Sequence, residues 1–247
     1  MAQEILAPRI PLRFAASLLL GGQLAYIAVT QLHAGGHAND HHEIFETYAH
    51  NDIWGAVHVG QFGSMALLLG GLIVLAFVLD RESGPARWFS RLGAAAAGAT
   101  LALYGVLQAV DGVALKQAVS AWASAPESEQ AARFAAAESI RWLEWAMRSY
   151  QDFALGLTLV LFAGASLASQ QLPRALGPVI ALSGIAYLAQ GWIAGTEGFS
   201  SAQSVAIVLG WVFSLFWMIW LTASGWLPGH GRTSSAPDAV NNAFVGA

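Results

Sequence analysis

The sequence predicts an all-α polytopic membrane protein, a six-helix transmembrane bundle with a helical extracytoplasmic cap. Hydrophobic residues make up 56% of the 247 residues and charged residues only 11%, whereas a soluble domain carries roughly 25% charged residues. The mean hydropathy is +0.53. Apolar residues gather in six stretches, each long enough to cross a hydrocarbon core of roughly 30 Å. This composition excludes a soluble enzyme, a disordered chain and a nucleic-acid-binding protein.

The six expected spans are residues 12–32, 53–79, 88–110, 150–170, 176–196 and 204–226. They define a transmembrane domain over residues 1–226, and the Gly-, Ser-, Pro- and Asn-containing residues 227–247 are expected to form a flexible cytoplasmic tail. The first stretch is long for a signal peptide, so we expect it to be retained. Ser124-Ala-Pro-Glu127 has the form of a capping box, which predicts a helix over residues 126–149 that continues into the fourth span.

The distribution of basic residues predicts the orientation of the bundle. If the N-terminus is cytoplasmic, seven of the eleven Lys and Arg residues fall in cytoplasmic segments, as the positive-inside rule requires. Both termini would then be cytoplasmic, and the loops after the first, third and fifth spans would face the exterior. We expect a location in the bacterial inner membrane.

Ionisable side chains inside the spans lie at a similar depth. Counted at about 1.5 Å per residue from the cytoplasmic ends, five groups from four helices fall near the outer edge of the bilayer: His58, Asp111, Arg148, Asp152 and Glu197. Charged groups within spans are costly and are typical of functional sites. They either converge on one outward-facing site or mark where each helix leaves the bilayer.

The fourth span carries a charged stripe of Glu138, Arg141, Glu144, Arg148 and Asp152. Their spacing of 3, 3, 4 and 4 residues places them within an arc of about 120° on one helix face. We predict that Asp111, Glu144 and Arg148 are catalytic acid, base or orienting groups, because burial beside opposite charges tunes their pKa values. The alternative is a structural network of ion pairs that fixes this helix to its neighbours.

Six of the seven histidines lie between positions 33 and 58. The first three, His33, His37 and His41, flank a Gly-Gly pair that disfavours a helix, so a loose metal-binding loop is one reading. From His41 onward the pattern is helical, with His42, Glu46, His50, Trp54 and His58 four residues apart. We predict Glu46, His50 and His58 as metal ligands. On a straight helix His50 and His58 are about 12 Å apart, so other side chains would have to complete the site. The alternative is a surface loop with no specific function.

The segment Trp54-x3-His58-x-Gly60 resembles the sequence around the haem-binding histidine of styrene oxide isomerase, a four-span membrane haem protein family. This resemblance implies a cofactor-binding role for His58, with haem b as the candidate cofactor. Since the spans offer no second histidine, the iron would keep an open position. The chain as a whole resembles six-span bacterial membrane proteins without an assigned activity, through the His/Trp/His second-helix entry, the segment from Asp111 to Lys116 and the Glu-x2-Arg-x2-Glu pattern of the fourth helix.

These features predict a membrane-embedded enzyme that binds a transition metal or haem and acts on a small apolar substrate at an outward-facing polar site. Two alternatives remain open. One is a small-molecule or ion-coupled transporter, and the other is an accessory subunit of a larger membrane complex. Besides the lipid bilayer, the expected partners are a small apolar ligand and either further copies of the chain or other subunits.

Overall fold

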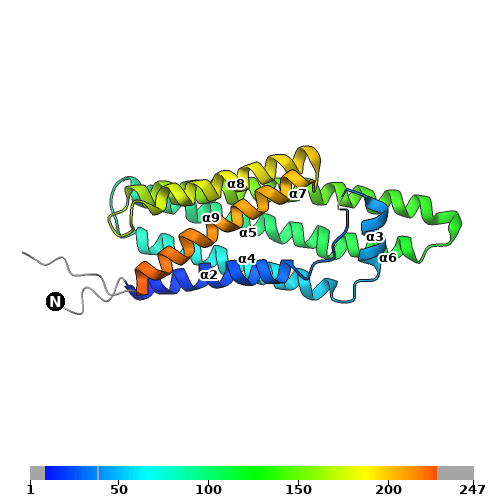
Figure 1. Ribbon diagram of the computed structural model, residues 1–247, viewed down its shortest axis with the longest axis horizontal. Helices are drawn as coiled ribbons and strands as arrows, with labels where there is room; N and C mark the ends of the chain where they lie inside the picture. Colours follow the sequence, from blue (N-terminus) through cyan, green and yellow to red (C-terminus); the bar gives the residue numbers. More distant parts are fainter. Residues whose placement is uncertain (1–8, 38, 227–247) are drawn as a thin grey trace, which may run out of the picture.

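The computed structural model describes residues 9–37 and 39–226, and these residues form helices joined by short connections (Figure 1). In chain order the helices are α2 (Arg9–Thr30), α3 (His41–Ala49), α4 (Trp54–Leu79), α5 (Pro85–Gln108), the π-helical segment η1 (Ala109–Leu115), α6 (Lys116–Ala123), α7 (Glu127–Ala168), α8 (Leu176–Glu197) and α9 (Ser201–Trp226). The described part of the chain contains no strand. The tail predicted over residues 227–247 lies outside the described residues.

The six predicted spans are confirmed as long apolar helices. They run along the long axis of the molecule, and the pair formed by α5–η1–α6 and α7 extends beyond the others to form a cap with α3 (Figure 1). Helix α7 packs against both α5 and α8, while α2 packs against α4 and α9. We call the end that carries α3 and α6 the cap end and the opposite end the terminal end.

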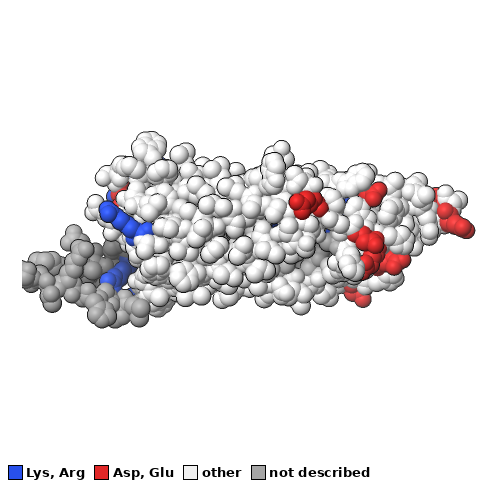
Figure 2. All heavy atoms as spheres, turned by 45° about the horizontal axis from the view of Figure 1, so that its top comes forward, with Lys and Arg blue, Asp and Glu red and all other residues white. Residues whose placement is uncertain are grey.

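Charge is concentrated at the two ends of the bundle. On the face shown in Figure 2, basic side chains appear at the terminal end, acidic side chains gather toward the cap end, and the band between them is almost free of charge. Such a band suits the hydrocarbon core of a bilayer. The fold class predicted from composition is therefore the observed one.

Helix α7 confirms the long helix predicted ahead of the fourth span, since it runs unbroken for 42 residues. The capping-box prediction is wrong, however. Pro126 is the residue that precedes the helix, and no side chain caps it. The Ser124 hydroxyl instead donates to the Ser120 carbonyl at the end of α6. Ser124 directly follows the last residue of α6, so its hydroxyl bonds a carbonyl of α6 and does not cap the start of α7.

The predicted continuous helix from His41 to His58 is also wrong. Helix α3 ends at Ala49 and α4 begins at Trp54. The Lys116 ammonium donates hydrogen bonds to the carbonyl oxygens of Tyr48, Ala49 and Asn51 at 2.6, 3.0 and 3.2 Å. These bonds satisfy carbonyl groups that the end of a helix leaves without partners. A residue far along the sequence thus stabilises the break, and α3 can turn across the cap.

Candidate functional site

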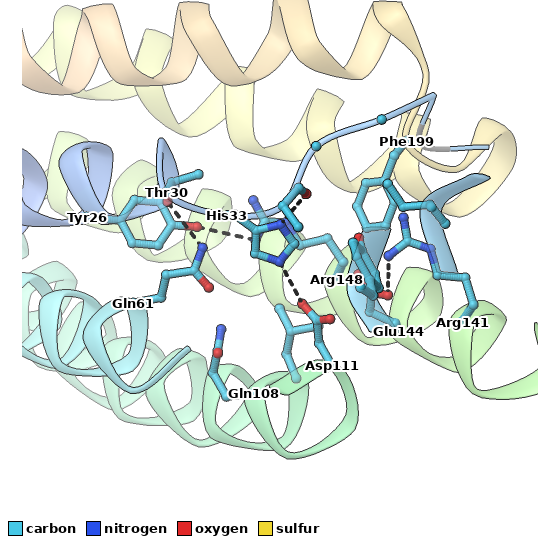
Figure 3. A pocket seen from close by; sticks show the side chains of 16 residues that line it. Tyr26, Thr30, His33, Gln61, Gln108, Asp111, Arg141, Glu144, Arg148 and Phe199 are labelled. Carbon is cyan, nitrogen blue, oxygen red and sulfur yellow. Dashed lines mark hydrogen bonds and ion pairs between the residues drawn. The ribbon is translucent and has the colours of Figure 1, made fainter. Parts of the chain in front are cut away.

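A cavity of about 300 Å³ lies where the cap meets the spans. Helices α2, α3, α4, α5 and α7, the segment η1 and the connection after α2 all contribute to its walls (Figure 3). The polar and charged residues that line it are Tyr26, Thr30, His33, Tyr48, Gln61, Gln108, Asp111, Arg141, Glu144 and Arg148. Side chains from separate spans therefore share one pocket at the cap end.

The centre of the site is a buried pair of His58 and Asp111. The His58 Nε2 atom lies 3.1 Å from Asp111 Oδ2, and the two residues are only 4% and 9% exposed. Asp111 belongs to the π-helical segment η1, a type of helix distortion that often occurs at functional sites. The Trp54 indole on α4 donates to the Gly112 carbonyl at 3.0 Å and ties η1 to α4. This contact holds Asp111 opposite His58.

His33 completes a group of three around Asp111. Its Nε2 atom lies 4.0 Å from the same Oδ2 atom that faces His58, and the two imidazole centroids are 5.1 Å apart. One candidate ligand atom from each of His33, His58 and Asp111 lies within 4.8 Å of the others. These residues come from the connection after α2, from α4 and from η1, so the group exists only in the folded bundle.

Both imidazoles are held in the orientation that metal ligands commonly adopt. The His58 Nδ1 atom faces the Trp54 carbonyl at 2.8 Å, and the His33 Nδ1 atom faces the Ala34 carbonyl at 2.9 Å. A carbonyl oxygen only accepts hydrogen bonds, so each Nδ1 carries a hydrogen and each neutral ring has its lone pair on Nε2. A backbone carbonyl that fixes the second ring nitrogen is typical of metal-bound histidine.

Burial favours the neutral form of His33. Loss of water around the imidazole lowers the pKa of His33 below its ordinary value of 6.5, while the neighbouring Asp111 carboxylate partly opposes this shift. The His58 Nε2 and Asp111 Oδ1 atoms are buried without an aligned hydrogen-bond partner. A cation or a polar ligand would satisfy buried polar atoms of this kind.

The charged stripe on α7 forms another wall of the cavity. Arg141 donates to Glu144 at 2.5 Å, and Arg148 lies 3.3 Å from Asp152 and donates to the Tyr26 hydroxyl at 3.3 Å. The arginine side chains are thereby held in place on the inner face of α7. Glu138 lies farther along the cap and pairs with His41 at 2.9 Å.

The structure brings together some of the predicted site residues and separates others. Asp111, Glu144 and Arg148 line the cavity, and His58 contacts Asp111. Glu46 and His50 lie elsewhere. Glu46 is exposed and faces His42 at 3.5 Å, while His50 bonds the carbonyl of its own helical turn. They do not join His58, because the break between α3 and α4 removes the helical register on which that prediction depended.

His33 is the site residue that the sequence reading did not select. Its only local signal is its place among the clustered histidines directly after the first span, and the Gly-Gly pair behind it indicated a loose loop. In the fold, this loop places His33 against Trp54, with 5.1 Å between their ring centroids. Glu197, which was expected at the same depth, is exposed and does not line the cavity.

The arrangement suits a single metal ion better than haem b. A haem iron would have to bind Nε2 of His58, because Nδ1 is held by the Trp54 carbonyl. That nitrogen faces the Asp111 carboxylate at 3.1 Å, which leaves no room for a porphyrin ring between the two. A small cation between His33, His58 and Asp111 would instead use all three side chains.

No protein-family model, curated protein or solved structure matches this chain. The resemblance of the segment around His58 to styrene oxide isomerase stays a prediction. A functional conclusion therefore depends on the chemistry of the site.

Proposed function

We propose that the protein is a membrane-embedded metalloenzyme that binds a transition metal through His33, His58 and Asp111 and acts on a small apolar substrate. One observation carries the proposal. Both histidines have Nδ1 bonded to a backbone carbonyl and direct Nε2 toward the same carboxylate oxygen. Two imidazoles and a carboxylate are a recurrent ligand set of catalytic zinc and non-haem iron sites.

This ligand set leaves coordination positions open for water or substrate. Bound zinc would activate water or polarise a carbonyl group, and bound iron would add redox chemistry. The chain has no cysteine, so thiolate-dependent sites are excluded and the ligands are nitrogen and oxygen atoms. Asp111, first expected to act as an acid or base, becomes a metal ligand in this proposal.

Glu144 and Arg148 would then act from the α7 wall of the cavity. Glu144 is the carboxylate available for proton transfer, and Arg141 beside it holds its orientation. Arg148 would orient a polar group of the substrate or a water molecule, since it is fixed by Asp152 and Tyr26. Fixed charges in a cavity removed from bulk water are effective in stabilising developing charge.

We place the site at the outer end of the bundle, in a bacterial inner membrane with both termini cytoplasmic. Two observations support this orientation. At the terminal end, Arg81 lies in the connection between α4 and α5 and Arg87 lies in the first turn of α5, in agreement with the positive-inside rule. The cap end carries acidic side chains on the face seen in Figure 2.

Metal analysis of the purified protein tests the proposal. We expect one equivalent of metal after loading with Zn²⁺ or Fe²⁺, and loss of that equivalent in His33→Ala, His58→Ala and Asp111→Asn. His50→Ala is the matched control, because His50 lies in the same histidine-rich segment but outside the group of three. Equal metal content in all four variants, or no binding by the wild-type protein, would refute the site. Size-exclusion chromatography separates a lost ligand from a misfolded variant.

A further inference from the structure

A second hollow, of about 380 Å³, lies on the flank of the bundle between α4 and the α5–η1 segment. We call it the lateral groove. Its lining residues are Gly55, His58, Val59, Phe62, Gly105, Gln108, Ala109, Gly112 and Val113. The volume is within the range of roughly 300–1,000 Å³ typical of small-molecule pockets. Apart from His58 and Gln108, every one of these side chains is apolar or absent.

The lateral groove opens on a surface that suits lipid. Val59 is 74% exposed and Val113 is 55% exposed, and both belong to helices long and apolar enough to cross a membrane. Exposed apolar side chains on helices of this kind suit contact with lipid. A molecule dissolved in the bilayer could therefore enter the groove without crossing an aqueous phase.

The groove and the polar cavity meet at the proposed metal ligands. Gln108 lines both hollows. His58 lines the groove, Asp111 lines the cavity, and these two side chains are 3.1 Å apart. The His58–Asp111 pair and Gln108 thus form the partition between the two hollows, with an apolar approach on one side and a polar approach on the other.

Missing side chains create the hollow. A β-carbon added at Gly55 would meet no atom within 4 Å, so this position is open space. A β-carbon at Gly112 would lie 2.9 Å from the His58 side chain, so the glycine there lets His58 approach η1. The groove is accordingly open at its rim and closely packed at its inner end.

The Gln108 Oε1 atom at this inner end is buried without a hydrogen-bond partner. A hydroxyl group could donate to this oxygen, and a carbonyl group could accept from the Gln108 amide hydrogens. His58 also lines the groove, and its Nε2 atom faces Asp111. A charged group is disfavoured, since the groove lining offers no opposite charge along the way and a desolvated charge is costly in a membrane.

We propose that the lateral groove binds a neutral amphiphile that enters from the bilayer, with its hydrocarbon part between α4 and η1 and its single uncharged polar group at Gln108, beside His58. This inference rests on the proposed function, because it names the substrate class of the same site. The apolar part would arrive from lipid, while water and protons would reach the opposite side of the partition through the polar cavity.

Photolabelling of the whole protein in lipid nanodiscs, without added metal, tests the groove. The probe is a long-chain alcohol that carries a diazirine near its hydroxyl group, and labelled residues are located by mass spectrometry. We expect saturable labelling near Gln108 and Gly112 that unlabelled long-chain alcohol competes away. Gly55→Leu should reduce this labelling about tenfold, and Ala109→Leu on the opposite wall should act in the same direction.

Gly70→Leu is the matched control, because Gly70 also lies on α4 in open space but outside the groove. It should label like the wild-type protein. Labelling that is spread along the apolar surface and resists competition would overturn the proposal, since it would report bulk lipid only. Equal competition by a long-chain carboxylate or ammonium would overturn the preference for an uncharged group. Metal loading is measured separately, so loss of the groove proposal leaves the metal site standing, and the reverse also holds.

Discussion

Replacing Gly112 by alanine is a direct test of whether the position of His58 matters. The new β-carbon would lie 2.9 Å from both Cβ and Cγ of His58, whereas ordinary van der Waals contact begins at 3.4 Å, so the imidazole must retreat by about 3.4 − 2.9 = 0.5 Å. Overpacking of this kind costs about 1–3 kcal/mol. If the metal-free protein relieves the contact by moving His58, metal binding has to bring the imidazole back to its original position, against the added methyl group. The affinity for metal should then fall by roughly 5- to 150-fold.

Titration with Co²⁺, followed by its visible absorption in nanodiscs, measures this change. Gly105→Ala is the control, because its β-carbon would make an ordinary contact of 3.5 Å with Phe62. The control lies on the same continuous helical segment and should bind Co²⁺ like the wild-type protein. Lower thermal stability in Gly112→Ala together with unchanged affinity for Co²⁺ would show that the position of His58 does not matter for metal binding.

Three further predictions concern the scaffold. Lys116→Met should lower the free energy of unfolding by about 1.5–3 kcal/mol, because charge-assisted hydrogen bonds to the end of α3 are lost. Amide hydrogen exchange over residues 41–53 should become faster. Unchanged exchange there would contradict this role of Lys116. Gly22→Ala should lower the free energy of unfolding by about 1–3 kcal/mol, because its β-carbon would lie 2.6 Å from the α4 backbone. The β-carbon of Gly21→Ala would meet open space, so this variant should raise the free energy of unfolding by up to about 1 kcal/mol. Thermal unfolding compares the two variants. The Glu43 carboxylate raises the pKa of His37 above its ordinary value of 6.5, so this pair adds stability below about pH 6.5 and loses it as the pH rises through the raised pKa. NMR titration should show the His37 pKa falling in Glu43→Gln, and an unchanged value would argue against the pair.

Much of the architecture follows from the sequence, because the bilayer constrains it strongly. A helix that crosses hydrocarbon must satisfy its own backbone groups and needs about 20 apolar residues, so the lengths of the apolar stretches predict all six spans. The spacing of the charged residues on α7 likewise predicts a common face. Arg141, Glu144 and Arg148 indeed line one cavity.

Which histidines meet was decided only by the tertiary structure. Periodicity assigns residues to a face of one helix, and it assumes that the helix continues. The break after α3 is stabilised by Lys116, which lies 65 to 68 positions away from the carbonyls it binds. This long-range contact separates His50 from His58.

The group of His33, His58 and Asp111 depends on two further features with no periodic signal. One is the connection after α2, which places His33 beside His58, and the other is the π-helical turn that carries Asp111. Hydrophobicity and spacing therefore determined the six spans and the charged face of α7. Side-chain contacts between segments far apart in sequence determined which atoms face one another, because a local pattern carries no information about a distant partner.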